Sequence, residues 1–330
     1  MVLIRSGVLT DLVASPTPKT ALALATSTGA SETLIIRMMR PLTALGIFRE
    51  TDITTYASTP ISQLVTAPPL LGGYQFMFDL ATRSLANMPR FLERTNFSHV
   101  DGPPGPFQDA NNTEDLMFPY LMKHPDLMTH FNAFMAGSLE TRKDWFRKFD
   151  AHSILLSGAK ADTPLLVNIA GGEGHDIQAF SRAFPSAPGS LILQDLPPVI
   201  DNIKSLDSNI IRQPYDFFTE QPVKGARAYY MRYIFHDWPD ERCVEIMERI
   251  AEAMVRGYSK LLIFEWVLKP KGVPLYPALL DVNMMALLNG RERTEEEWRG
   301  LLGRAGLRVV KFHGGEEGGE EEGLVKAELA

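Results

Sequence analysis

The chain has 330 residues, of which 45% are hydrophobic, a formal net charge of −7 and a single cysteine, Cys243. This acidic balance excludes nucleic-acid binding through a broad basic surface, because such binding depends on clustered lysine and arginine. One thiol forms neither an intramolecular disulfide nor a multi-cysteine zinc site, and no apolar run approaches the roughly 20 residues of a membrane span, so we expect a cytoplasmic globular protein without a membrane anchor.

The first part of the chain has the pattern of a winged helix. Helical spacing near residues 20–27 and 31–45 is followed by two short strand-like stretches, and helix, helix, strand, strand is the order of that fold. Such a module often reads DNA through its second helix, but here that helix offers only Arg37 and Arg40. We therefore expect a packing or dimerisation role rather than DNA binding.

Residues 65–150 are rich in phenylalanine, methionine and leucine at helical spacing. The pattern predicts helices, and for most of these side chains a place in the core. An apolar helical connector between two domains can also line a ligand cleft, because such clefts favour domain junctions. Phe131 and Met135 are our candidates for contact with a substrate there.

From Pro164 onward, strand and helix patterns alternate. The strand-like runs cover residues 165–170, 190–195, 226–235 and 259–266. This alternation predicts an α/β domain with a doubly wound parallel sheet. Two final strand-like runs, 307–313 and 323–329, predict an antiparallel pair at the sheet edge. The acidic run that separates them, GGEEGGEEEG, is interpreted as a solvated hairpin loop, with a cation site as the alternative.

A glycine cluster follows the first of these strands, in the sequence LLVNIAGGEGHD. In open α/β sheets the first strand-to-helix turn is glycine-rich, so that a ligand can approach the backbone closely. Gly171, Gly172 and Gly174 supply that turn. The dinucleotide pattern requires a further glycine where the chain has Ile177, and no Gly-Lys-Ser/Thr phosphate loop follows. NAD, ATP and GTP are therefore disfavoured.

Three further residues favour a nucleoside ligand. Asp195 ends the next strand, 21 residues after Gly174, where its carboxylate can bind both ribose hydroxyls; capping of a helix near Pro197 is the alternative. Asp216 stands at a later strand end and can contact an adenine, with Phe217 available to stack on it. A ribose-binding acid without a pyrophosphate pattern makes S-adenosylmethionine the best candidate.

The sequence MRYIFHDWPDERC carries the candidate catalytic residues. A strand is expected to deliver His236 and Asp237 to the carboxyl edge of the sheet. With an unperturbed pKa of about 6.5, the imidazole can take a proton from a phenol or enol; a structural role at the strand-helix turn is the alternative. Glu265 and Glu292 stand where carboxylates can hold the imidazole on either side and stabilise its charged form.

Together, LVNIAGGEGHD, LILQDLPPVI, YDFF, YYMRYIFHDWPDERC and LLDVNMMALLNGRERTEEEWRGLLGRAGL resemble the S-adenosylmethionine-dependent O-methyltransferases of the plant caffeate type, and most closely their fungal secondary-metabolism branch. The resemblance runs from about residue 5 to the end of the chain. It implies a winged-helix dimerisation-type domain over residues 1–110 and a Rossmann-like methyltransferase domain over 111–330, with a helical connector at 111–160. It also implies a homodimer.

The resemblance further implies the roles of individual residues. His236 is implied as the catalytic base, with Glu265, Glu292 and Asp237 beside it. The acceptor is implied to be a small aromatic or polyketide-type compound that meets Met284 and Asn283. No metal is implied. S-adenosylmethionine is the implied cofactor, in contact with Gly171, Gly172, Gly174, Asp195, Leu196, Asp216, Phe217 and Arg232.

Three departures from the family pattern bear on these expectations. Asn168 stands where the family has aspartate, so a charge that favours a cationic cofactor is missing. Ala170 replaces a glycine, which is acceptable where the backbone keeps a negative φ. The segment before residue 5 is shorter than in the family, whose further helices there intertwine two subunits, so the usual dimer is in question. Two alternatives stay open: a pericyclase or dehydratase on the same fold, and a non-enzymatic winged-helix regulator, which the acidic charge disfavours.

Overall fold

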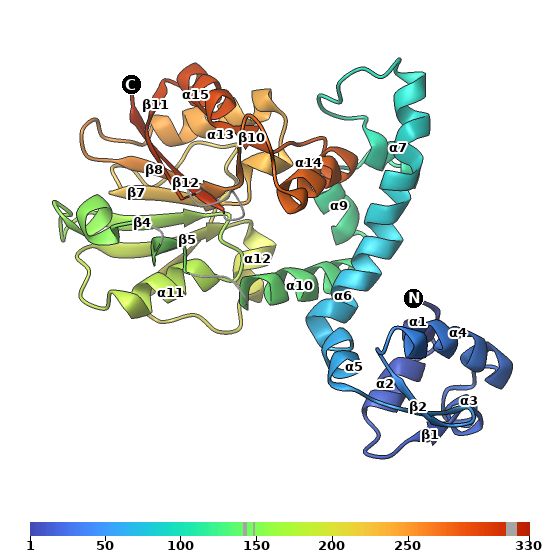
Figure 1. Cartoon of the computed structure of the whole chain (residues 1–330). Helices are drawn as coiled ribbons and strands as arrows, with labels where there is room; N and C mark the ends of the chain where they lie inside the picture. Colours follow the sequence, from blue (N-terminus) through green and yellow to red (C-terminus); the bar gives the residue numbers. More distant parts are fainter. Residues whose placement is uncertain (141–143, 148, 315–321) are drawn as a thin grey trace. The chain divides into compact units, whose positions relative to one another are not determined.

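The computed structural model describes residues 1–140, 144–147, 149–314 and 322–330, and Figure 1 shows its elements along the chain. The chain forms two compact units, each built from two stretches of sequence. This division differs from the single boundary at residue 110 that the sequence suggested. One unit comprises Met1–Ala86 and Met117–Arg142, and the other comprises Asn87–Leu116 and Lys143–Ala330.

The first unit begins with a winged helix, as predicted. Helices α3 (Ala21–Thr28) and α4 (Glu32–Ala44) are followed by strands β2 (Arg49–Asp52) and β3 (Thr55–Ala57). Strand β3 pairs antiparallel with both β2 and β1 (Lys19–Thr20). The core of this module is apolar and almost fully buried, and it includes Leu12, Leu24, Ile35, Phe48 and Tyr56. The other elements are α1 (Val2–Arg5), α2 (Val8–Val13), α5 (Pro60–Val65), α6 (Pro68–Phe76), η1 (Met77–Ala81), α9 (Met117–Met122) and α10 (Pro125–Glu140), while α7 (Thr82–Arg94) contributes to both units.

Helices α6 and α10 cross closely at a glycine. A Cβ on Gly72 would lie 2.7 Å from the carbonyl oxygen of His130, so the backbones meet where α6 has no side chain. Nearby, the ring of Phe131 packs 5.2 Å from the ring of Phe76. Phe131 therefore contributes to the helical core of this unit. Its contact with a substrate, like that of Met135, stays a prediction.

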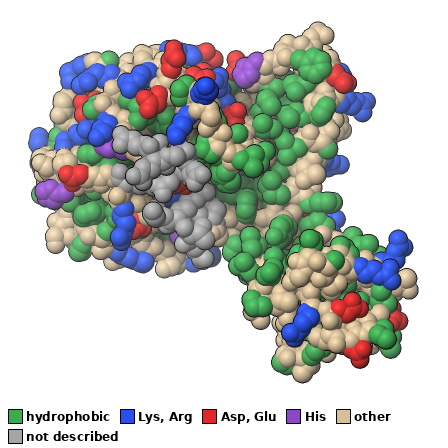
Figure 2. Space-filling view, in the orientation of Figure 1, with side chains coloured by type: hydrophobic (Ala, Val, Ile, Leu, Met, Phe, Trp, Pro, Cys, Tyr) green, Lys and Arg blue, Asp and Glu red, His purple; other side chains and the backbone are tan. Residues whose placement is uncertain are grey.

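The distribution of surface charge and the lengths of the helices were compared with what nucleic-acid binding and membrane spanning require. On the face that Figure 2 shows, acidic and basic side chains of the winged helix are intermixed rather than gathered into one basic patch. An electrostatic footprint for a phosphate backbone needs a clustered basic surface. Across the described ranges, no helix combines the length and the apolar character that crossing a membrane requires.

The second unit is built on a seven-stranded sheet with the order β11-β12-β8-β7-β4-β5-β6. The strands from β8 to β6 in this order are parallel, and β12 is antiparallel to both β8 and β11. This confirms the predicted parallel sheet with an antiparallel pair at one edge. The strands are β4 (Pro164–Ile169), β5 (Ser190–Asp195), β6 (Ile210–Pro214), β7 (Ala228–Arg232), β8 (Lys260–Glu265), β11 (Leu307–His313) and β12 (Gly323–Leu329).

Helices cover both faces of this sheet (Figure 1). Leu261 and Ile263 of β8 belong to one hydrophobic core, and Leu262 and Phe264 belong to another, because successive side chains of a strand point to opposite faces. Burial on both faces explains why these strands are nearly continuous apolar runs. The helices of this unit are α8 (Pro106–Asn111), η2 (Trp145–Arg147), η3 (His152–Leu156), α11 (His175–Ala183), α12 (Pro197–Asn202), η4 (Phe235–Asp237), α13 (Asp240–Ala251), α14 (Leu275–Leu288) and α15 (Glu295–Arg304).

Two details of this unit differ from the expectation. β7 ends at Arg232, whereas we expected a strand to reach residue 235; His236 lies instead on the short 3-10 helix η4. The two-residue strands β9 (Val267–Leu268) and β10 (Arg293–Thr294) form a parallel pair that the sequence pattern did not predict. This pair joins the segment that follows β8 to the segment that precedes α15.

Candidate active site

The candidate site residues converge at one edge of the sheet, where the parallel strands end. The glycine loop follows β4, while Asp195, Arg232 and Glu265 are the last residues of β5, β7 and β8. The strand order reverses at β4, since β5 and β6 lie on one side of it and β7 and β8 on the other. Open α/β sheets bind their ligands at such a point, beyond the carboxyl ends of the strands.

The glycine loop needs its glycines for two different reasons. Gly172 and Gly174 have φ values of 58° and 84°, a region that other residues rarely adopt. Gly171 has no room for a side chain, since a Cβ there would lie 2.5 Å from Cδ1 of Leu193 and 2.6 Å from Oδ1 of Asn168. The loop therefore presents bare backbone at the end of β4.

Asp195 is tied to the glycine loop. Its Oδ2 accepts a hydrogen bond from the N–H of Gly172 at 2.8 Å, and its Oδ1 accepts one from the N–H of Leu196 at 2.7 Å. Burial raises the pKa of this carboxyl above its ordinary value, although the two N–H donors oppose the rise. Helix α12 has Leu196 as its N-cap and no side-chain capping bond, so Asp195 is not the helix cap that was the alternative.

Three other candidates for cofactor contact lie at the ends of the neighbouring strands. Leu196 is an exposed apolar side chain directly after Asp195. Asp216 is exposed and its Oδ1 accepts a hydrogen bond from the N–H of Phe218 at 3.0 Å, so it stabilises its own turn. The ring of Phe217 packs edge-on against that of Trp238, which directly follows η4. Their contacts with a cofactor stay predictions.

Ala170 adopts a left-handed backbone conformation, with φ of 52°. We expected alanine to be acceptable here where φ is negative, and the structure shows that this condition is not met. A left-handed alanine costs roughly 1–2 kcal/mol, because its Cβ approaches a carbonyl oxygen. The loop therefore carries backbone strain directly beside its glycines.

Asn168 is buried in β4 directly below the loop. Its side chain is 2% exposed, and its Oδ1 has no hydrogen-bond partner in the described part of the chain. That oxygen lies beside Gly171, as the clash with a Cβ at that residue demonstrates. A buried acceptor without a donor is costly, and it is also available to the N–H group of a ligand.

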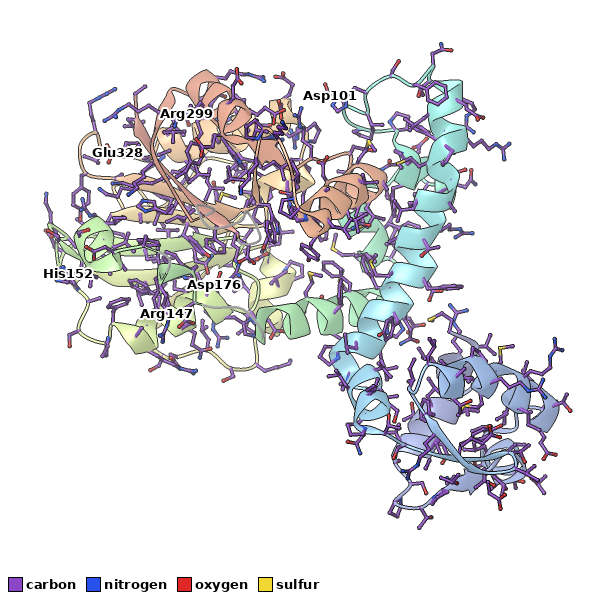
Figure 3. All side chains as sticks on the ribbon, viewed as in Figure 1. Asp101, Arg147, His152, Asp176, Arg299 and Glu328 are labelled. Atoms are coloured by element: carbon purple, nitrogen blue, oxygen red, sulfur yellow. The ribbon has the colours of Figure 1, made fainter. Side chains whose placement is uncertain are left out.

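Arg232 lies between two acids. One guanidinium nitrogen donates to Oδ1 of Asp176 at 2.7 Å, and the other terminal nitrogen lies 3.9 Å from Oε1 of Glu322. Asp176, in the first turn of α11, also accepts a hydrogen bond from the hydroxyl of Tyr230 at 2.8 Å; Figure 3 labels this residue. Asp176 and Glu322 were not among the predicted site residues, although Asp176 stands in the glycine-loop sequence and Glu322 in the acidic run.

His236 is held between two carboxylates. Its Nδ1 lies 2.7 Å from Oε1 of Glu292, and its Nε2 lies 3.3 Å from Oδ1 of Asp237. The residue is 6% exposed. Gly290 lets the chain approach, since a Cβ there would lie 1.9 Å from the carbonyl oxygen of His236. The N–H of Arg291 donates to the same oxygen at 3.0 Å, so backbone contacts bring Glu292 to the ring.

These carboxylates change the protonation of the site. Burial disfavours the imidazolium, but the carboxylates of Asp237 and Glu292 outweigh this and raise the pKa of His236 to about 9. Burial also raises the pKa of Asp237 to about 6, against the attraction of the imidazolium. A ring with this pKa carries a proton at neutral pH, unlike a histidine with the unperturbed pKa of about 6.5. It must lose a proton before it can accept one.

Glu265 holds the backbone rather than the ring. Its Oε1 accepts hydrogen bonds from the N–H of Phe235 at 2.7 Å and from that of Ile234 at 3.1 Å. It is 1% exposed, and burial raises its pKa to about 7. Glu265 thus fixes the turn that carries His236. The expected pair of carboxylates on either side of the ring is made by Glu292 and Asp237.

Arg293 is a further residue of the site that sequence reasoning missed. Its guanidinium donates to the carbonyl oxygens of Phe235 and Trp238, both at 2.9 Å, and to Oδ1 of Asp240 at 2.8 Å. The side chain is 1% exposed. It therefore fastens both ends of η4. Its only sequence signal was an arginine next to Glu292 in the charged run GRERTE.

Both candidates for contact with an acceptor, Asn283 and Met284, lie on α14. Met284 is 7% exposed, and Oδ1 of Asn283 is buried without a hydrogen-bond partner in the described residues. A hollow of about 420 Å³ borders Glu292 and is lined by Asp281, Met285 and Arg291 among others. Neither Met284 nor Asn283 lines it, so their contact with an acceptor stays a prediction.

The chain belongs to the O-methyltransferase family. The family model of the O-methyltransferase domain matches residues 105–308, and that of the O-methyltransferase dimerisation domain matches residues 4–68. The methyltransferase family uses S-adenosylmethionine as its cofactor. The winged helix thus corresponds to the family's dimerisation domain, and the sheet with its glycine loop corresponds to the methyltransferase domain.

Individual relatives place the chain among fungal enzymes of secondary metabolism. The O-methyltransferase asqD of Emericella nidulans is 39% identical over 97% of this chain and 83% of its own length, and penC of Penicillium thymicola is 37% identical over 96% and 79%. The structure of LepI in complex with SAM has a TM-score of 0.90 at 28% identity, covering 100% of this chain and 84% of that one. OxaC in complex with sinefungin and meleagrin has a TM-score of 0.89 at 30% identity, with coverages of 100% and 84%.

Proposed function

We propose that the protein transfers the methyl group of S-adenosylmethionine to a hydroxyl of a small aromatic or enolic natural product, with His236 as the base that receives the hydroxyl proton. The position of His236 between the carboxylates of Glu292 and Asp237, here called the carboxylate clamp, carries the proposal. Because Glu292 holds Nδ1 at 2.7 Å, Nε2 is the ring atom that can face an acceptor. The clamp stands at the same sheet edge as the glycine loop, and transfer requires both reactants in one place.

The residues at the sheet edge fit the proposed cofactor. Asp195, beside Gly172, offers a carboxylate to a ribose, and Phe217 offers a ring to an adenine. The unpaired oxygen of Asn168 is a buried acceptor, and two nitrogens of Arg232 are buried donors without a hydrogen bond in the described residues. Such groups suit the ammonium and carboxylate of an amino-acid moiety. When bound, the cofactor supplies an electrophilic methyl group on a positively charged sulfur.

His236 acts on the acceptor through Nε2. Asp237 lies 3.3 Å from that nitrogen, so an acceptor hydroxyl takes the place of the Asp237 carboxylate. Once deprotonated, the ring would accept the hydroxyl proton at Nε2, and the hydroxyl oxygen would then be nucleophilic toward the methyl group that the bound cofactor would supply. Glu292 stays on Nδ1 and stabilises the imidazolium that results. Glu265 keeps the turn in place through its two backbone hydrogen bonds.

The test is the variant His236→Ala. We expect methyl transfer to phenols to fall at least about 100-fold, because general-base catalysis is lost. The dissociation constant of S-adenosylmethionine, measured by calorimetry, should stay within about twofold of the parent value, since the imidazole is proposed to face the acceptor. His152→Ala is the control, because His152 is an exposed histidine of η3 (Figure 3). Full activity in His236→Ala would remove His236 as the base.

A second candidate function is a pericyclic rearrangement or a dehydration on the same fold. The buried amide of Asn168 favours it, because the family's carboxylate is missing there. A solved structure described as a pericyclic reaction enzyme also matches this chain, with a TM-score of 0.89 at 28% identity over 100% of this chain and 85% of that one. Incubation with labelled cofactor and a panel of phenols separates the two. Labelled product supports methyl transfer, whereas tight cofactor binding without labelled product supports the second candidate.

We also propose that the protein forms a homodimer through its winged helix. The match of residues 4–68 to the dimerisation domain supports this. A dimer has twice the chain mass of 36.8 kDa, and light scattering after size-exclusion chromatography measures that mass directly. A mass of one chain at micromolar concentration would contradict the proposal.

A further inference from the structure

The start of β12 lies at the candidate active site. Because β12 is antiparallel to both β8 and β11, the end of β11 and the start of β12 lie at the carboxyl edge of the sheet. Gly323, which begins β12, pairs with Glu265, which ends β8. Glu322 directly precedes this pair. The acidic run that we expected to be a solvated loop thus has its last acid at the site, while its residues 315–321 lie outside the described ranges.

Glu322 contacts two neighbouring residues at the end of β7. Its Oε1 accepts a hydrogen bond from the hydroxyl of Tyr233 at 2.6 Å and lies 3.9 Å from a terminal nitrogen of Arg232. Only 13% of the Glu322 side chain is exposed. A carboxylate this deeply buried is usually paired, and here a phenol and a guanidinium partner it.

Tyr233 connects Glu322 to the catalytic imidazole. Its ring lies 5.3 Å from the ring of His236, at an interplanar angle of 34°. Its backbone has φ of 52°, a conformation that persists in a non-glycine residue only where the surrounding structure fixes it. The N–H of Tyr233 donates to the carbonyl oxygen of Phe264, and the hydroxyl donates to Glu322. The residue is therefore held at both ends.

Arg232 connects Glu322 to the glycine-loop side of the site. The same guanidinium that faces Glu322 donates to Asp176 at 2.7 Å, and Asp176 stands in the first turn of the helix that follows the loop. Two carboxylates thus share one guanidinium, whose side chain is 7% exposed. The line Asp176, Arg232, Glu322, Tyr233 and His236 runs from the loop to the base.

We propose that Glu322 is a positioning residue for the methyl transfer: it holds Tyr233 against the His236 ring and keeps Arg232 between two carboxylates. This inference rests on the proposed function. Glu322 touches neither ring nitrogen of His236, so it acts through Tyr233 and Arg232 rather than on the reacting atoms. Through these two contacts, Glu322 holds the base and the glycine loop in their relative places.

The kinetic test uses Glu322→Ala, Tyr233→Phe and the double variant. We expect each single change to lower kcat about tenfold while KM for the acceptor changes little, because a misplaced base slows the chemical step without weakening binding. The double variant should lose no more than either single variant, because both break one chain of contacts. Glu322→Gln, which keeps an acceptor for the Tyr233 hydroxyl, should lie between the parent and Glu322→Ala. The proposal would be overturned if the kcat loss of the double variant were the product of the two single losses. It would also be overturned if kcat of Glu322→Ala lay within about twofold of the parent value.

The matched control is Glu328→Ala. Glu328 lies at the other end of β12, where its carboxylate faces Arg308, Lys260 and Lys326; Figure 3 labels it apart from Asp176. The control variant removes one carboxylate from β12, the strand that follows Glu322, and kcat should stay at the parent value. Thermal unfolding of each variant tests that the fold is retained.

A second measurement does not depend on turnover. The imidazole signals of His236 in an NMR spectrum, assigned by their loss in His236→Ala, should shift and broaden in Glu322→Ala and Tyr233→Phe but not in Glu328→Ala. If the parent transfers no methyl group, the proposed function fails while this measurement still tests the positioning. Unchanged His236 signals in Glu322→Ala would show that Glu322 does not position the ring.

Discussion

Nδ1 of His236 lies 2.7 Å from Oε1 of Glu292, a residue 56 positions later in the chain. The contact orients the ring and assigns the two nitrogens different roles, because Nδ1–H is committed to the carboxylate and Nε2 is left to face an acceptor. It also stabilises the charged ring. A buried imidazolium between Glu292 and Asp237 is a poor base until it is deprotonated.

The pH profile should therefore rise at alkaline pH. Deprotonated His236 is the active form, and its pKa is raised to about 9 by Asp237 and Glu292 against the effect of burial. We expect kcat/KM to increase about tenfold per pH unit up to about pH 9, since that parameter reports the free enzyme. Initial rates with a phenol of known pKa, measured from pH 6 to pH 10, check this. If the rising limb of the kcat/KM profile instead levelled off near about pH 6.5, the ring would titrate like an ordinary histidine.

Asp237→Asn should move this limb to lower pH. The change removes the carboxylate that lies 3.3 Å from Nε2 and that favours the imidazolium. With less opposing attraction, burial lowers the pKa of His236, so more of the enzyme is deprotonated at pH 7. The expected shift is at least about one pH unit. Asp201→Asn, an exposed acid of α12, is the control and should leave the limb unchanged. An unshifted limb in Asp237→Asn would show that Asp237 does not set the charge of the ring.

The fold could be predicted from the sequence because its pattern repeats over long stretches. β4, β5 and β8 are apolar runs buried on both faces, and such runs are recognisable without any partner. The glycines of the loop could be predicted for a similar reason, since their backbone geometry selects the residue type directly. The strands β9 and β10 could not, because two residues carry no periodicity.

The contacts of the candidate site were less predictable, because they join distant or irregular segments. The sequence offered both Glu265 and Glu292 as acids beside His236, and the structure distinguishes them, because Glu292 pairs with the ring and Glu265 with the backbone. The roles of Arg293 and Glu322 depend on contacts between segments far apart in the chain, since Arg293 bonds to the residue that follows η4 and Glu322 bonds to Tyr233. The left-handed φ of Ala170 could not be predicted either, because an alanine in the sequence does not indicate that conformation.

Ala170→Gly should stabilise the protein slightly. Glycine adopts the φ of 52° without strain, which regains roughly 1–2 kcal/mol, but it loses about 0.5–1 kcal/mol more backbone entropy on folding. The expected net gain is between about 0 and 1.5 kcal/mol in the free energy of unfolding. Urea unfolding measures it, with Ala136→Gly in the exposed interior of α10 as the control that should lose about 1 kcal/mol. Equal losses in both variants would contradict the strain at Ala170.

Asn168→Asp should weaken the free protein and strengthen cofactor binding. The site is 2% exposed and offers the new carboxylate no donor at Oδ1, so we expect a loss of about 1–3 kcal/mol without cofactor. A bound ammonium or sulfonium would compensate that charge, so the dissociation constant of S-adenosylmethionine should fall. Calorimetry measures the binding and thermal unfolding measures the stability. Asn132→Asp adds the same charge at an exposed position of α10 and should change neither. An unchanged dissociation constant would show that position 168 does not sense the cofactor's charge.

Arg293→Met should destabilise the protein strongly. The guanidinium is 1% exposed and satisfies the carbonyl oxygens of Phe235 and Trp238 together with the carboxylate of Asp240. Its removal leaves the two carbonyl oxygens without this donor, whereas the Asp240 carboxylate is 39% exposed and can bind water, so we expect a cost of about 3 kcal/mol from the buried contacts. Arg299→Met is the matched control, because the exposed ion pair of Arg299 with Glu295 should be worth less than about 1 kcal/mol. Urea unfolding monitored by tryptophan fluorescence measures the free energy of unfolding of both variants. Equal stabilities of the two would refute the role of Arg293 in holding the turn that carries His236.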